Sequence, residues 1–273
     1  MRWLIGSALY VSVLALISSL ASRGPGLDPH ESSPVSTPMA QPVVLELFTS
    51  EGCSSCPPAD ALLKKLDDAG RLDDVEIIAI EEHVDYWNRQ GWTDPFSSPD
   101  WTRRQERYSE AFRRDGIYTP QLVVNGRAEL VGSSERQIRQ KISEAAKLSA
   151  ATVRISSINF TSNSAELMVA SQRLAGESRS AELWVAVTER GLSSNVLRGE
   201  NEGRTLVHAA VLRSLKRIRP ASSDPSGGAE FRMTVALSQA WKRENLRFVV
   251  FLQEPKSLNI LGAAAASMNQ IRN

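Results

Sequence analysis

Cysteine is nearly absent from this chain, which has only two in 273 residues. A framework of several disulfides is therefore excluded, and a bridge between Cys53 and Cys56 would close too short a loop to contribute much stability. Basic and acidic side chains nearly balance, with a formal net charge of +1. This balance offers no electrostatic basis for a nucleic-acid partner or an acidic membrane surface. The chain also has no internal repeat. Because a bridge over this short loop would add little stability, we expect the cysteine pair to serve chemistry.

The one long apolar stretch stands at the start of the chain. Arg2 precedes an apolar run from Leu4 to Leu20, and small residues follow its end, which is typical of a secretory signal over 1–21. The alternative is an uncleaved anchor, the only case in which we expect membrane association. Export to the periplasm or the medium would place the thiols in an oxidising compartment. Residues 22–42 carry five prolines and predict a disordered linker.

From 43 to 149 the pattern alternates between strands and helices. We expect strands at 43–48, 75–80, 121–124 and 128–131, and helices at 56–69, 99–114 and 134–148. Ser98 and Pro99 provide a cap and a first residue for the second helix. Asn125-Gly126 between two apolar runs predicts a tight hairpin. The order predicts an α/β domain.

Residues 150–273 predict a mainly β domain, because short strand-like segments alternate with turns. The expected strands are 152–160, 164–171, 181–189, 204–216, 229–237 and 246–253. Their spacing favours an antiparallel sandwich, although 207–217 also fits a helix. The polar, glycine-bounded loop Gly199–Arg204 is interpreted as a strand connection, with a domain-interface or ligand loop as the alternative.

The cysteine pair stands where the first predicted strand gives way to a helix. Ser54 or Ser55 is expected to cap that helix, and Pro57 and Pro58 fit its first turn. A thiolate at Cys53 would be stabilised there by the helix dipole and nearby N–H groups. Two thiols at this spacing can close a disulfide or share a metal ion.

The arrangement over residues 43–148 resembles the thioredoxin fold, because Cys-x-x-Cys ends the first strand and Thr119-Pro120 opens the hairpin. More closely, the motifs CSSCPPAD at 53–60 and HVDYW at 83–87 look like a family of secreted bacterial proteins of unknown function. This resemblance implies a fold more strongly than it implies an activity.

The resemblance implies roles for several residues. Cys53 would be the exposed nucleophile and Cys56 the resolving thiol. A cis Thr119-Pro120 bond would pack Pro120 against the disulfide, leaving the backbone of Tyr118 and Thr119 free to pair with substrate. Related oxidoreductases often keep a buried acid behind the resolving cysteine, and we expect Glu46 to act as that base.

A polar and aromatic cluster follows the second strand. His83, Asp85, Trp87 and Trp92 could wall the cysteine site and bind a peptide or small thiol, or could simply cap the sheet. His83 also allows a rival function, because Cys53, Cys56 and His83 form a soft ligand set suited to copper.

Together these patterns predict an exported thiol-disulfide oxidoreductase that needs no cofactor. Its partners would be a thiol- or disulfide-containing protein or a small thiol, and a redox partner protein. The first alternative is a copper-binding or metal-delivery module. The second is a noncatalytic binding protein whose bridge only staples the helix, which predicts a buried Cys53.

Overall fold

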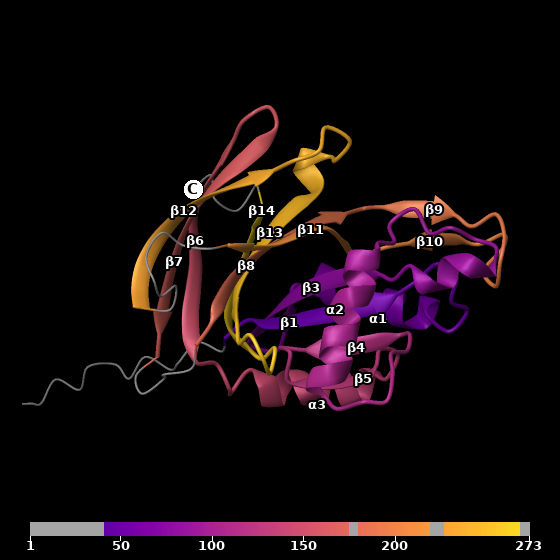
Figure 1. Cartoon of the computed structure of the whole chain (residues 1–273), viewed down its shortest axis with the longest axis horizontal. Coiled ribbons are helices and arrows are strands. Elements are labelled where there is room, and N and C mark those ends of the chain that lie inside the picture. Colours follow the sequence, from indigo (N-terminus) through magenta and orange to yellow (C-terminus); the bar gives the residue numbers. More distant parts are fainter. Residues whose placement is uncertain (1–40, 175–179, 219–226, 268–273) are drawn as a thin grey trace, which may run out of the picture. The chain divides into compact units, whose positions relative to one another are not determined.

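The computed structural model describes residues 41–174, 180–218 and 227–267 (Figure 1). All of the described residues belong to one compact unit. The predicted signal and nearly all of the predicted linker lie outside the described residues. Within the described ranges, no helix has the length and apolar character needed to cross a bilayer.

Strands and helices alternate in the first half, as predicted. Its elements are β1 (Val43–Thr49), α1 (Pro57–Ala69), β2 (Arg71–Leu72), β3 (Val75–His83), the 3-10 helix η1 (Tyr86–Gln90), α2 (Pro99–Ala111), β4 (Gln121–Val124), β5 (Ala128–Val131) and α3 (Glu135–Ala145). β1 pairs in parallel with β3 and antiparallel with β4, which forms a hairpin with β5. Asn125 and Gly126 both have positive φ, at 47° and 64°, so the predicted tight turn is confirmed. Ser98 caps α2 as predicted, its side chain accepting from the N–H of Asp100.

The strand β1 is central and buried on both faces. Leu45 and Leu47 belong to an apolar cluster with α1 and α3. On the opposite face, Phe48 packs with Tyr108 of α2. Burial on both faces explains why β1 has a nearly continuous apolar sequence instead of an alternating one.

The second half is mainly β, as predicted. Its elements are β6 (Ala151–Phe160), β7 (Ser164–Arg173), β8 (Glu182–Arg190), β9 (Ser193–Asn195), β10 (Thr205–Val207), β11 (Ala210–Ile218), β12 (Gly227–Ala236), the 3-10 helix η2 (Arg243–Asn245), β13 (Leu246–Gln253) and β14 (Ile260–Ser267). Several of these strands extend the sheet of the first half. The resulting nine-stranded sheet has the order β14-β13-β8-β11-β3-β1-β4-β5, with β2 attached to β3. The two halves therefore share one sheet, and the division at 149/150 stays a prediction.

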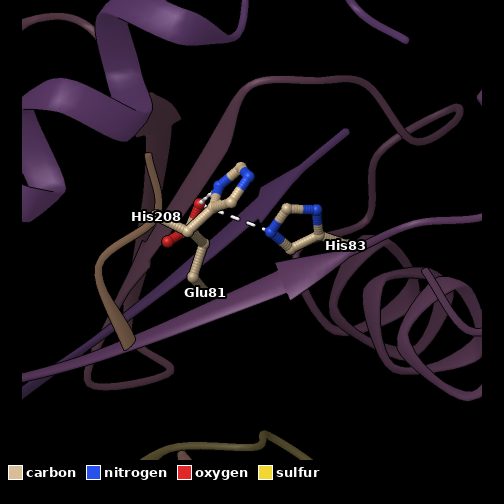
Figure 2. Close-up of side chains that lie close together, drawn as sticks. All are labelled: Glu81, His83 and His208. Carbon is tan, nitrogen blue, oxygen red and sulfur yellow. Dashed lines mark hydrogen bonds and ion pairs between the residues drawn. The ribbon is translucent and has the colours of Figure 1, made fainter. Parts of the chain in front are cut away.

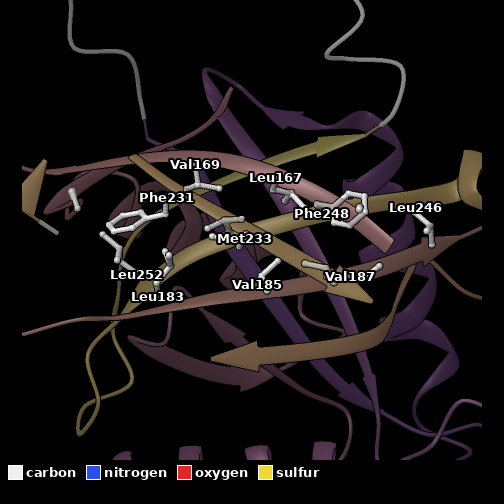
Figure 3. Packing of buried hydrophobic residues seen from close by; sticks show 14 of the residues in the cluster. Leu167, Val169, Leu183, Val185, Val187, Phe231, Met233, Leu246, Phe248 and Leu252 are labelled. Carbon is white, nitrogen blue, oxygen red and sulfur yellow. The ribbon is translucent and has the colours of Figure 1, made fainter. Parts of the chain in front are cut away.

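A second, three-stranded sheet has the order β12-β7-β6 and packs against the first. Figure 3 shows side chains from both sheets meeting, among them Val169 and Met233 from one and Val185 and Phe248 from the other. This sheet-on-sheet core agrees with the sandwich expected from the strand spacing. Its large sheet also carries the helices of the first half, which strand spacing could not indicate.

The sequence predicted one strand over 204–216, but this segment forms two strands, β10 and β11. β10 pairs with β9 in a small separate sheet, whereas β11 pairs with β8 and, in parallel, with β3. His208 and Ala209 join β10 to β11, and the N–H of His208 donates to the carbonyl of Leu192. The break brings His208 into the interior next to the end of β3.

Candidate functional site

Cys53 and Cys56 form a disulfide immediately before α1, with a Cα–Cα distance of 5.4 Å. Cys56 itself is the N-cap residue, and its carbonyl accepts from the N–H groups of Ala59 and Asp60. Capping by Ser54 or Ser55, expected from the sequence, is therefore wrong. The prolines do fall in the first turn, as predicted, where missing N–H groups cost little. The Cys56 N–H donates to the Cys53 carbonyl, so it is not directed at the Cys53 sulfur.

The Thr119-Pro120 bond is cis, as the resemblance implied. The Thr119 hydroxyl donates to Cys53 Sγ at 3.3 Å and accepts from Trp87 Nε1 at 2.8 Å. Ser55 Oγ lies 3.3 Å from the same sulfur. A Cβ at Gly52 would lie 3.1 Å from Trp87 Cβ, so Trp87 packs closely on the turn before Cys53. Two hydroxyls and an indole therefore surround the Cys53 side of the bridge.

The segment from β9 to β10, residues 193–207, is hydrogen-bonded to the backbone of the cysteine turn, and we call it the cap. Asn201 Nδ2 donates to the carbonyls of Glu51 and Cys53, each at 2.9 Å. A Glu200 carboxylate oxygen accepts from the N–H of Ser54 at 2.9 Å. The loop Gly199–Arg204 thus connects two strands, as interpreted from the sequence, and also contacts the cysteine turn. Its role as a domain-interface or ligand loop stays a prediction.

Cys53 and Cys56 are both completely buried, with exposed fractions of 0%. The expectation of an exposed nucleophile at Cys53 is therefore wrong for this conformation. The sequence placed Cys53 at an open helix end, but the cap comes from residues almost 150 positions later. Reaction at this sulfur requires the cap, or the Trp87 and Thr119 side, to move.

Two histidines and three carboxylates form a buried cluster beside the motif. His83 Nδ1 lies 2.7 Å from an Asp94 oxygen. His208 lies 2.9 Å from Glu81 through Nδ1 and 2.9 Å from Glu51 through Nε2. Figure 2 shows both imidazoles directed at the Glu81 carboxylate. Since Glu51 stands two residues before Cys53, the cluster is connected to the cysteine turn.

The charges in this cluster stabilise one another. Burial alone would lower the pKa of His83, but Asp94 and Glu81 hold it well above its ordinary value. In the same way Glu51 and Glu81 outweigh burial and raise the pKa of His208 to about 9. The Glu81 pKa falls to about 2 despite burial, because His208 hydrogen-bonds its carboxylate and both histidines attract its charge. The neighbouring carboxylates therefore favour the protonated form of both imidazoles.

Asp60, in the first turn of α1, connects this cluster to an open cavity. Burial and the nearby Glu81 raise the pKa of Asp60 to about 7, although the Thr49 hydroxyl donates to it at 2.6 Å. The cavity holds about 570 Å³ and is lined by Pro57, Asp60, Ala61, Lys64, Lys65, Asp68, Thr205, Leu206 and Val207. Asp60 is four residues after Cys56, so the two side chains share one face of α1.

Glu46 is buried, as predicted, but it lies on the α2 face of β1. Its carboxylate accepts from Arg104 Nε and from the Tyr108 hydroxyl, both at 2.5 Å. Glu82 lies 3.4 Å from the same arginine, and burial raises the pKa of Glu82 well above its ordinary value. Glu46 thus has a cationic partner on α2, and its role as a base for Cys56 stays a prediction.

The remaining predicted residues separate into two groups. Trp87 and Trp92 are at the site, the latter donating from Nε1 to Glu51 at 2.8 Å. Asp85 instead accepts from Thr102 of α2 at 2.6 Å. The Tyr118 hydroxyl donates to Glu129 of β5, away from the sulfur.

The copper set Cys53, Cys56 and His83 stays a prediction, and in this structure the two sulfurs are bonded to each other. Among the described residues, the candidate metal-ligating group is instead Glu81, His83 and His208. Sequence reasoning assigned no role to Asp60, Asp94, Asn201 or His208. Asp60 ends the CSSCPPAD motif and Asn201 lies in the glycine-bounded loop, but Asp94 and His208 belong to no motif.

The comparisons with known proteins place these features in a family of unknown function. A crystal structure of an Agrobacterium tumefaciens protein from a structural genomics programme is 28% identical, with a TM-score of 0.62, covering 85% of this chain and 96% of that one. HBP35 of Porphyromonas gingivalis, 13% identical with a TM-score of 0.60, covers 85% of this chain and 76% of its own, and shares the fold alone. No curated protein matches the sequence. The family model "Protein of unknown function (DUF1223)" matches residues 44–253, most of the chain, so this protein belongs to the DUF1223 family.

Proposed function

We propose that this protein is an exported thiol-disulfide oxidoreductase that reacts through Cys53 and Cys56. The observation that carries the proposal is the disulfide at the start of α1 with the Thr119 hydroxyl on Cys53 Sγ and the cis Thr119-Pro120 bond next to it. The neighbouring strand order β3-β1-β4-β5 supports the further proposal that residues 43–149 are thioredoxin-like. The apolar run before the linker supports export.

The reaction would proceed in two exchanges. A substrate thiolate attacks Cys53 Sγ, the Cys53–Cys56 bond breaks, and its electron pair leaves on Cys56. A second substrate thiolate then attacks the substrate sulfur of the mixed disulfide and displaces the Cys53 thiolate. The substrate gains a disulfide and the protein is reduced by two electrons, with both new thiolates available for protonation. Reversal of the same steps reduces a substrate.

Asp60 is the proposed proton donor for Cys56. It lies one helical turn beyond Cys56 on the same face of α1, and its carboxyl is buried with a pKa of about 7. A group that titrates near neutral pH can both give and accept a proton there. Asp60 also lines the 570 Å³ cavity, so it has a route to solvent.

The cap would control access to Cys53. Asn201 and Glu200 bind the backbone on both sides of the cysteine, and the sulfur is fully buried beneath them. A partner would either displace the cap or react when it opens. The buried sulfur would then react with the few substrates that can hold the cap open.

Trapping of mixed disulfides tests the proposal directly. Cys56→Ser should form a stable adduct at Cys53 with a small disulfide such as oxidised glutathione, whereas Cys53→Ser should form less, because Cys56 would be the resolving thiol. The double variant measures the background. If neither single variant forms an adduct above this background under native conditions, disulfide exchange at this site is excluded.

A second candidate is favoured by the complete burial of Cys53. A noncatalytic binding protein would keep a permanent bridge that holds the start of α1 in place. If this function is correct, the bridge should be reduced only when the whole protein unfolds. Comparing the urea dependence of reduction with that of unfolding separates the two functions. Copper binding by the cysteines and His83 remains a proposal for the reduced protein, to be tested by metal analysis after reduction.

A further inference from the structure

Three buried side chains converge from two distant parts of the chain. Glu81 and His83 are alternate residues of β3 and so project from the same face of the strand. His208 comes from the link between β10 and β11. One donor atom from each of the three lies within 4.8 Å of the others (Figure 2).

The His83 ring leaves one nitrogen without a hydrogen-bond partner. Nε2 is fully buried and forms no hydrogen bond, and its nearest acidic oxygen is Glu81 Oε1 at 3.4 Å. Donor atoms bound about 2.05 Å from a tetrahedral ion lie roughly 3.3 Å apart, so this separation fits a shared ion. The contact is an ion pair without a hydrogen bond, which leaves this buried nitrogen incompletely satisfied.

Each histidine also has an outer carboxylate. His83 Nδ1 is bound to Asp94, which is in turn held by the Glu51 N–H at 2.9 Å. His208 Nε2 is bound to one carboxylate oxygen of Glu51, and Trp92 Nε1 donates to the other oxygen of the same carboxylate. Metal-ligating histidines usually have such a partner on the second ring nitrogen, because it fixes the ring and strengthens the ligand. Three carboxylates around two imidazoles also favour a cation between them.

We propose that Glu81, His83 and His208 bind a divalent transition-metal ion of the zinc class. His83 would bind through Nε2, His208 through Nδ1 and Glu81 through its carboxylate. Two imidazoles and one carboxylate are a recurrent ligand set for Zn²⁺. The site contains no cysteine, so it is distinct from a copper site at the cysteines. Leu206, two residues before His208, lines the 570 Å³ cavity.

The test is isothermal titration calorimetry, in which Zn²⁺ is added to the untagged, full-length protein in its disulfide form. One equivalent should bind in the wild type. His208→Ala should weaken the affinity by about 100-fold or more, and the outer variant Asp94→Asn by about 10- to 100-fold. His30→Ala removes the third histidine of the chain, outside the described residues, and should bind like the wild type.

Cobalt substitution keeps the proposal testable if the variants fail to fold. Co²⁺ bound to the wild type should give visible ligand-field bands of a four- or five-coordinate ion without a thiolate charge-transfer band. Saturable Zn²⁺ binding with these spectra would support the site. Absence of saturable binding, a thiolate band, or affinity that is unchanged in folded His208→Ala would overturn it.

Discussion

Removing the Asn201 side chain should open the cap without unfolding the protein. Asn201 is buried, and its amide nitrogen donates to the carbonyls of both Glu51 and Cys53. The variant Asn201→Ala removes both hydrogen bonds, although the Cys53 carbonyl keeps its bond from the Cys56 N–H. The bond between Glu200 and the Ser54 N–H would remain.

The size of the effect follows from the two lost hydrogen bonds. Each contributes about 1 kcal/mol net, so the closed cap should lose about 2 kcal/mol relative to the open one. Since 1.4 kcal/mol corresponds to a factor of ten, the open population should rise by about 30-fold. If a thiol reaches Cys53 only when the cap is open, the rate of reduction rises by the same factor.

The assay measures how fast dithiothreitol reduces the Cys53–Cys56 disulfide in native buffer. Samples are quenched with an alkylating reagent, and the alkylated fraction is determined by mass spectrometry. Glu202→Ala is the matched control, because Glu202 is exposed on the same loop. It should be reduced at the wild-type rate. The reasoning is refuted if Asn201→Ala is reduced no faster than the control, or if its faster reduction has the full urea dependence of global unfolding.

Three further predictions concern stability, each measured by urea denaturation. The Asp60 pKa is raised from 3.8 to about 7, so its contribution is fully present below about pH 4 and is lost as the pH rises through 7. Relative to Asp60→Asn, the wild type should therefore lose about 4 kcal/mol of unfolding free energy over this interval, and parallel pH curves would contradict this. Glu46→Gln should lower the free energy of unfolding by about 3 kcal/mol, because buried Arg104 loses its countercharge. An altered pH profile of disulfide exchange in the folded variant would support the role of Glu46 as a base. Gly126→Ala should cost about 3 kcal/mol or more, because its Cβ would lie 1.9 Å from the Leu258 carbonyl. Gly70→Ala, with similar φ but nothing within 4 Å, should cost only about 1 kcal/mol, and equal losses would refute the steric argument.

Short-range patterns were sufficient for much of the first half. The apolar run of β1, Ser98 before Pro99, and Asn125-Gly126 act over a few residues, and the structure confirms the elements they predicted. The cap of α1 was misassigned, because serine and cysteine compete within one short turn and their backbone angles decide the cap. The strand prediction over 204–216 failed for a related reason. A two-residue break at His208 leaves the apolar pattern almost unchanged but redirects the chain.

By itself, the sequence determined where the cysteines stand, before a helix that accepts two prolines, and that Thr119-Pro120 opens the hairpin. Only the tertiary structure decided that Cys53 is buried and that His83 lies beside His208. The physical reason is separation along the chain. Asn201 bonds to the Cys53 carbonyl across 148 positions, and His208 contacts Glu81 across 127. Such contacts depend on β11 pairing with β3, which no local pattern of residues encodes.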